Sequence, residues 1–137
     1  MSWAESLIKI STYEVEVLQK RLGEIVERRL AAEAKLEGLH AEGEAEAVRA
    51  RQDAAAGWYH VGFLEGLRMR KAAVHVEIAA AIAEERGARD ALAEAFETQK
   101  KYELVAETAK EMLRKDRGRQ EANAFDELGI RRAKRSG

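Results

Sequence analysis

Apolar residues recur along the chain at alternating spacings of three and four. The series in the first half covers fourteen positions, ten of them apolar, and the series in the second half covers sixteen positions, twelve of them apolar. A repeat of 3.5 residues held over many turns predicts α-helices that supercoil with the repeated positions facing a partner helix. We call these positions the seam. The first series is Ala4, Ile8, Ser11, Val15, Leu18, Leu22, Ile25, Arg29, Ala32, Leu36, Leu39, Gly43, Glu46 and Ala50; the second is Leu64, Leu67, Lys71, Val74, Ile78, Ala81, Glu85, Ala88, Leu92, Ala95, Gln99, Tyr102, Ala106, Ala109, Leu113 and Asp116.

The two series fall out of phase at the segment GWYHVG, residues 57–62. Gly57 and Gly62 bracket this segment, and glycine accepts the backbone angles that end one helix and begin another. We therefore expect the chain to reverse here, so that position i faces roughly position 119 − i across an αα-hairpin. The alternative is one continuous helix that dimerises in parallel, but each glycine inside such a helix would cost about 1 kcal/mol.

The expected fold is all-α, an antiparallel two-helix coiled-coil hairpin with a C-terminal helical overhang. The pattern predicts helix one at about residues 2–55, a turn at about 56–62, helix two at about 63–130 and a basic tail at 131–137, in a single domain. With this register the second helix runs out of partner at about residue 116, because the first helix has ended there.

Composition narrows the class of protein. Charged residues make up 36% of the chain, but 24 basic residues nearly cancel 25 acidic ones, so the net charge favours neither nucleic acid nor a membrane surface as a partner. The four basic residues in RRAKRSG are expected to form a solvated tail. The chain has no cysteine, and its start, MSWAESLIKI, does not resemble a signal peptide, so we expect a cytoplasmic protein.

Motifs for catalysis and for metal or cofactor binding are absent from the sequence. It contains no glycine-rich phosphate loop, no G-x-S-x-G and no H-E-x-x-H. The three histidines, His40, His60 and His75, are far apart, and the carboxylates mostly lie four residues from a base, as in ordinary surface pairs. We expect no enzyme, no metal and no cofactor.

Two groups of apolar residues are left over once the seam is assigned. Near the turn, Trp58 and Tyr59 either fill the space where the helices separate or, with their neighbours, contact a partner. The candidate docking strip there, expected mostly beside the seam, is Phe63, Leu67, Arg70 and Val74.

The second group lies near the two termini. Trp3, Leu7, Ile10 and Val17, with Tyr13 beside them, form a stripe rotated away from the seam. Either Phe125 and Leu128 fold back over this stripe, or this end of the protein inserts into another protein.

Three tracts make the chain similar to a known family. They are STYEVEVLQKRLGEIVERR near the start, FLEGLRMRK after the centre and RQEANAFDELGIRR near the end. Together they resemble the FliJ family of flagellar export proteins over essentially the whole chain, and GWYHVGF with DELGIRR looks like its alphaproteobacterial branch.

This resemblance implies a non-enzymatic protein that acts as a central stalk of the export ATPase ring. The implied partners are that ring and its regulator, the cytosolic part of the membrane export gate, and export chaperones. The implied location is cytoplasmic, at the inner face of the membrane through partners only. By position, Phe63, Leu67, Arg70 and Val74 match the gate-binding strip, although Arg70 stands where a small residue is usual. The equivalent stalk of a virulence secretion system and a generic coiled-coil scaffold or adaptor remain as alternatives.

Overall fold

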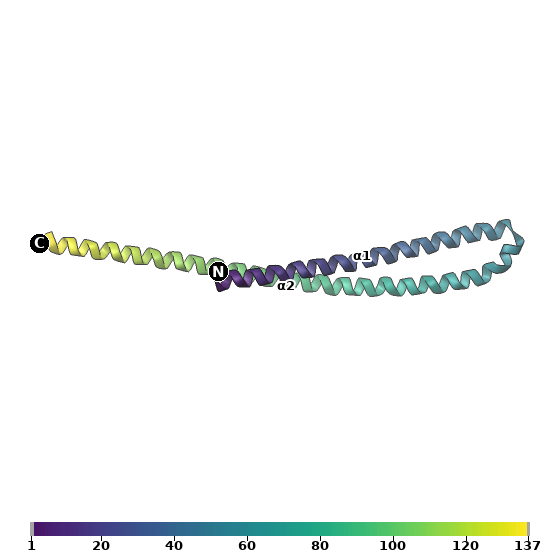
Figure 1. Ribbon diagram of the computed structural model, residues 1–137, viewed down its shortest axis with the longest axis horizontal. Coiled ribbons are helices and arrows are strands. Elements are labelled where there is room, and N and C mark those ends of the chain that lie inside the picture. The colour runs from purple at the N-terminus through teal and green to yellow at the C-terminus, as the bar shows by residue number, and fades with distance from the viewer. Residues whose placement is uncertain (1, 137) are drawn as a thin grey trace. The chain divides into compact units, whose positions relative to one another are not determined.

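Two long helices make up the part of the chain that the structure, a computed structural model, describes: residues 2–136. Helix α1 spans Trp3–Gln52 and helix α2 spans Ala54–Ser136 (Figure 1). The chain forms two compact units. The hairpin unit is Val15–Glu94, and the terminal unit is Met1–Glu14 with Ala95–Gly137. In the hairpin unit α1 and α2 pack against each other in opposite directions, so the expected all-helical hairpin is confirmed.

The repeat in the sequence becomes the packed seam. Every one of the fourteen positions assigned in the first half is buried or half-buried. One cluster of the core of the hairpin unit is formed by Ala32, Leu39, Leu67 and Val74, with Leu36, Phe63 and Ile78 packed against it. Burial of a side chain of the size of Leu or Val contributes roughly 1.5–3 kcal/mol. Because the core is only one side chain wide, stability must accumulate along the length of the seam.

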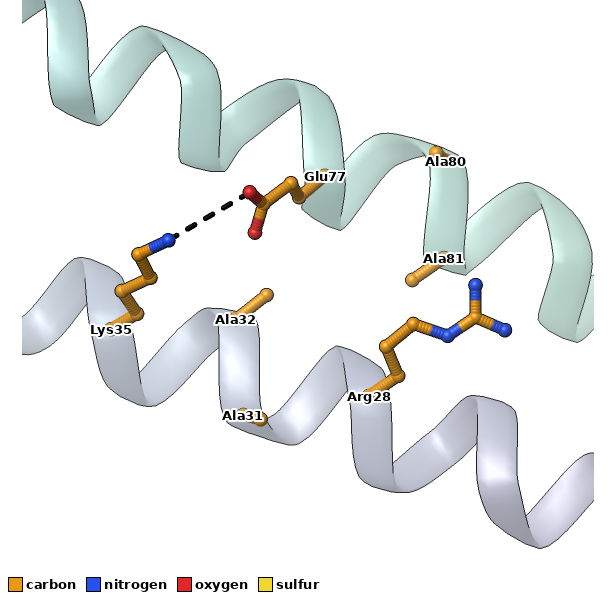
Figure 2. A pocket seen from close by; sticks show the side chains of 7 residues that line it. All are labelled: Arg28, Ala31, Ala32, Lys35, Glu77, Ala80 and Ala81. Atoms are coloured by element: carbon orange, nitrogen blue, oxygen red, sulfur yellow. Dashed lines mark ion pairs between the residues drawn. The ribbon is translucent and has the colours of Figure 1, made fainter.

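Alanine occupies the seam in the middle of the hairpin unit. Ala32 and Ala81 point toward each other from the two helices and are 7% and 3% exposed (Figure 2). Beside them runs a shallow groove of about 340 Å³, spanned by an ion pair between Lys35 Nζ and Glu77 Oε1 at 3.8 Å. Small side chains suit close helix approach, and Ala31 and Ala80 also line this groove (Figure 2).

The chain reverses at Asp53, and the expectation of a turn over residues 56–62 is wrong. The Asp53 amide donates to the Arg49 carbonyl, and the Asp53 carbonyl accepts from the Gly57 amide, both at 3.2 Å. Asp53 Oδ1 also accepts from the Ala55 amide at 3.0 Å, which makes Asp53 the N-cap of α2. One residue therefore ends α1 and begins α2. Among residues 2–136 no glycine has a positive φ, so no glycine acts as the expected helix breaker.

The earlier turn changes the register between the helices. Ion pairs in the hairpin unit join Arg28 to Glu84, Lys35 to Glu77 and Glu42 to Arg70. In each pair the two residue numbers add up to 112, not to the expected value near 119. The shift also moves the start of the second seam, where Phe63 is half-buried and Leu64 is 44% exposed. The assignment of Leu64 to the seam is therefore wrong.

The terminal unit begins with a capping box. The Glu5 amide donates to Ser2 Oγ at 3.2 Å, and the Ser2 amide donates back to Glu5 Oε2 at 3.4 Å. Ala4 and Ser11 are buried, and the Gln99 side-chain amide donates to Thr12 Oγ1 at 3.0 Å. These contacts hold the start of α1 against α2 within this unit.

Beyond Ala109, α2 has no partner helix. Every residue from 110 to 135 is exposed, including Leu113 and Asp116, which were assigned to the seam. The predicted overhang therefore exists but begins about six residues earlier than expected, because the register is shorter. The helix continues to Ser136 through most of the basic tail, and Gly137 lies outside the described residues. The organisation as a single domain stays a prediction.

Candidate partner-binding surfaces

The docking strip near the turn is mostly part of the core. Leu67 is 3% exposed and Val74 2% exposed, while Phe63 is half-buried against the same cluster. Leu67 and Val74 were assigned to the seam as well as to the strip, and their burial agrees with the seam assignment. Phe63, which was expected beside the seam, also packs partly against this core, so the expectation of a strip mostly beside the seam is wrong. Arg70 alone is on the outside, where its Nη2 lies 3.4 Å from Glu42 Oε1. Contact of this strip with a partner stays a prediction.

The aromatic residues after the turn do not fill the hairpin end. Trp58 is 79% exposed and Tyr59 66% exposed, and their rings meet edge-to-face with centroids 4.9 Å apart. The inner side of this first stretch of α2 carries Gly57 and His60, which are half-buried. The buried His60 Nδ1 has no hydrogen-bond partner among the described residues. The turn end therefore places its bulky apolar side chains in solvent.

The stripe predicted near the N-terminus is exposed. Trp3, Ile10 and Tyr13 in the terminal unit are 63%, 63% and 68% exposed, and Leu7 is half-buried. Val17, on the same helix in the hairpin unit, is 47% exposed. These residues follow each other at three- or four-residue spacing, so they share a side of α1 distinct from the seam. Contact of this stripe with a partner stays a prediction.

A groove in the terminal unit was missed in the sequence. Trp3 lines one side of it, and α2 supplies the rest, giving a volume of about 360 Å³. Leu104 and Met112 on its wall are 66% and 61% exposed. In the sequence, Leu104, Thr108 and Met112 follow each other at four-residue spacing, which places them on one side of a helix. This spacing was overlooked because the seam series runs through the same segment. The α2 residues of the groove are Leu104, Val105, Thr108, Ala109 and Met112.

Phe125 and Leu128 lie on the overhang and do not fold back. They are 73% and 52% exposed, and α2 passes through them without a break. With Gly129 and Arg132 they line a small depression of about 190 Å³. The alternative in which Phe125 and Leu128 fold back over the N-terminal stripe is therefore wrong.

A partly buried ionic network lies in the seam of the hairpin unit. Arg29 Nε donates to Glu85 Oε2 at 2.7 Å, and Arg89 donates to Glu85 Oε1 at 2.9 Å. The pKa of Glu85 is lowered mainly by the hydrogen bond from Arg89 and next by the one from Arg29. The pKa of Arg29 is raised mainly by its hydrogen bond to Glu85 and next by its hydrogen bond to Glu33. Both charges are thus compensated, and the network offers no free group for catalysis.

Comparison with known proteins identifies the family. The chain is 56% identical over 131 residues to the flagellar FliJ protein of Caulobacter vibrioides, in strain NA1000 / CB15N and in strain ATCC 19089 / CB 15 alike. The match covers 96% of this chain and 94% of the relative. The chain belongs to the FliJ family of flagellar proteins. No family model and no solved structure matches it.

As a member of the FliJ family, the protein is a component of the flagellar export apparatus and not an enzyme. Within residues 2–136, no group of three or more His, Cys, Asp or Glu side chains is arranged to hold a metal ion. Neither helix, over the same residues, has a segment long and apolar enough to cross a bilayer.

Proposed function

We propose that this FliJ-family protein is a non-enzymatic stalk of the flagellar type III export apparatus. In this role it couples the export ATPase ring, with its regulator, to the cytosolic part of the membrane export gate, and it handles export chaperones. The protein would work in the cytoplasm, at the inner face of the membrane through these partners.

The observation that carries the proposal is the unpaired overhang in a chain so similar to a flagellar FliJ protein. A single helix of about 26 residues gains nothing from tertiary packing, so exposed Phe125 and Leu128 on it favour a partner. Trp3 and the groove beside it add a second apolar surface in the same unit. We assign both to contact with the ATPase ring, together with Leu7, Ile10, Tyr13 and Val17.

The gate contact is assigned to the strip after the turn. Arg70 is accessible, and Phe63 is half-buried at the same level of the hairpin. Leu67 and Val74 are buried, so in the closed hairpin they support the strip from below and do not touch a partner themselves.

The test is stimulation of the purified export ATPase by the full chain. We expect Phe125→Ser with Leu128→Ser to reduce stimulation strongly while the circular dichroism spectrum stays the same, because both side chains are exposed. Ala124→Ser, an exposed position on the same helix, is the matched control and should stimulate as the wild type does. Equal stimulation by all three proteins would remove the overhang from the proposed contact.

A further inference from the structure

A second 3–4 repeat runs along α2 in the hairpin unit, on a side of the helix that is separate from the seam. The repeat has ten positions, none of them charged. They are Ala55, Tyr59, Gly62, Gly66, Met69, Ala73, Val76, Ala80, Ala83 and Gly87. All ten are exposed. In a chain with 36% charged residues, the outer face of a two-helix hairpin should be its most charged surface. We call these positions the outer face.

Large apolar side chains on the outer face are well separated from the core. Tyr59, Met69 and Val76 are 66%, 66% and 69% exposed, and Trp58 at its edge is 79% exposed. Leu67 and Val74, which alternate with them along the helix, are buried in the seam. Between residues 58 and 76, α2 therefore has apolar side chains on two opposite sides, although the hairpin uses only one of them.

The glycines of the outer face are not explained by the hairpin. A Cβ added at Gly62, Gly66 or Gly87 would meet no heavy atom within 4 Å. Glycine is among the least favourable residues inside a helix, so nothing within the hairpin compensates for its presence at these positions. Another helix lying on this face would use the space that they leave.

The charges at the edges of the outer face select the occupant. We assign a second heptad to α2 in which the outer-face residues take positions a and d. In this heptad Glu65 takes position g, and Arg70, five residues later, takes position e. In a parallel pair of α2 helices Glu65 of each copy faces Arg70 of the other, and no like charges face each other across the face. Both side chains are accessible, at 59% and 51% exposure.

We propose that the outer face is a self-association surface, on which a second copy of the chain packs α2 against α2 in parallel. Trp58 of one copy then lies next to Phe63 of the second copy, again in the g-to-e relationship. Within each copy Glu65 is paired with Arg68 at 2.7 Å and Arg70 with Glu42 at 3.4 Å, and both pairs exchange partners when the dimer forms. The dimer is reversible, goes beyond the proposed stalk function and does not rest on it.

Sedimentation equilibrium of the full chain over a concentration series tests the proposal. We expect a monomer–dimer equilibrium in the wild type and at least a tenfold weaker dimer in Val76→Glu, which buries a charge in the new interface. Val48→Glu on α1 is the matched control, since Val48 is 48% exposed and lies outside the outer face. A wild type that stays monomeric at every concentration, or equal effects of the two substitutions, overturns the proposal.

Three further variants test the parallel arrangement. Glu65→Lys should weaken the dimer about tenfold, and adding Arg70→Glu should restore it. The chain has no cysteine, so Ala73→Cys should form a disulfide between copies on oxidation, because identical outer-face positions meet along the whole length of a parallel pair. A dimer that neither recovers with the double charge reversal nor cross-links refutes the parallel arrangement. ATPase stimulation by Val76→Glu should equal that of wild type, which separates this test from that of the stalk function.

Discussion

Leu67 packs directly on Gly43 across the hairpin. A Cβ added to Gly43 would lie only 2.7 Å from Leu67 Cδ2, closer than side chains tolerate. The Leu67 side chain therefore fills the space that the missing side chain of Gly43 leaves in the seam. The absence of a side chain at residue 43 is what allows Leu67 to be buried.

Replacement of Gly43 by alanine tests this contact. Gly38→Ala is the matched control, since a Cβ at Gly38 meets no heavy atom within 4 Å. We expect the control to stabilise the protein by about 1 kcal/mol through helix propensity. Gly43→Ala should be less stable than this control by about 1–3 kcal/mol, because Leu67 must move. Urea unfolding measures both, and equal free energies of unfolding would contradict the contact.

Asp53 should matter more to stability than the glycines that follow it. Asp53→Ala removes the side-chain acceptor of the Ala55 amide and should cost about 1 kcal/mol. Asp53→Asn keeps an acceptor and should retain most of the stability. Thermal unfolding followed at 222 nm distinguishes the two variants, and an Asp53→Ala protein as stable as Asp53→Asn would show that the cap contributes nothing.

The lowered pKa of Glu85 predicts an acid-dependent contribution to stability. The contribution is present above the pKa of about 4.3 that glutamate has in an unfolded chain, and it is lost as the pH falls through the lower folded value. Arg29, with its raised pKa, stays charged throughout this range.

Urea unfolding between pH 2 and pH 7 of wild type and Glu85→Gln measures this contribution. The difference in stability between the two proteins should be largest near neutral pH and shrink below about pH 4. Glu37→Gln, at an exposed residue without a described ion pair among residues 2–136, should show no such trend. A difference that does not depend on pH would show that Glu85 acts by packing and not by charge.

Substitutions in the strip after the turn should separate stability from binding. Leu67→Ala is expected to destabilise the hairpin by about 2–5 kcal/mol, because Leu67 is only 3% exposed. Arg70→Ala removes an exposed ion pair and should change stability by less than about 1 kcal/mol.

If the strip binds the export gate as proposed, Arg70→Ala should weaken that binding without loss of helix content. Arg68→Ala is the matched control, because Arg68 also makes an exposed ion pair but points elsewhere on α2. Calorimetric titration with the purified cytosolic part of the gate gives the affinities. Identical affinities for the two variants would remove Arg70 from the gate contact.

Truncation tests the independence of the overhang. Because residues 110–135 are exposed throughout, deletion of residues 117–137 should leave the thermal unfolding of the hairpin unit nearly unchanged. A large drop in the transition temperature would mean that the overhang contributes to the core.

The sequence by itself determined which side chains of α1 form the seam. The 3.5-residue repeat holds every first-half position from Ala4 to Ala50 on one side of α1, and burial of that side follows from periodicity alone. Similarity to a family was also visible in the sequence, because it depends on residues and not on their positions in space.

Only the tertiary structure decided where the helices turn and which residues face each other. A cap by Asp53 and a break at Gly57 differ by about 1 kcal/mol of local preference, so neither position is compelled by the local sequence. The choice falls to contacts between distant segments, such as Leu67 on Gly43 and Arg28 with Glu84. The register that these contacts select buries Leu67 and Val74, leaves Trp58 in solvent and begins the overhang at Lys110.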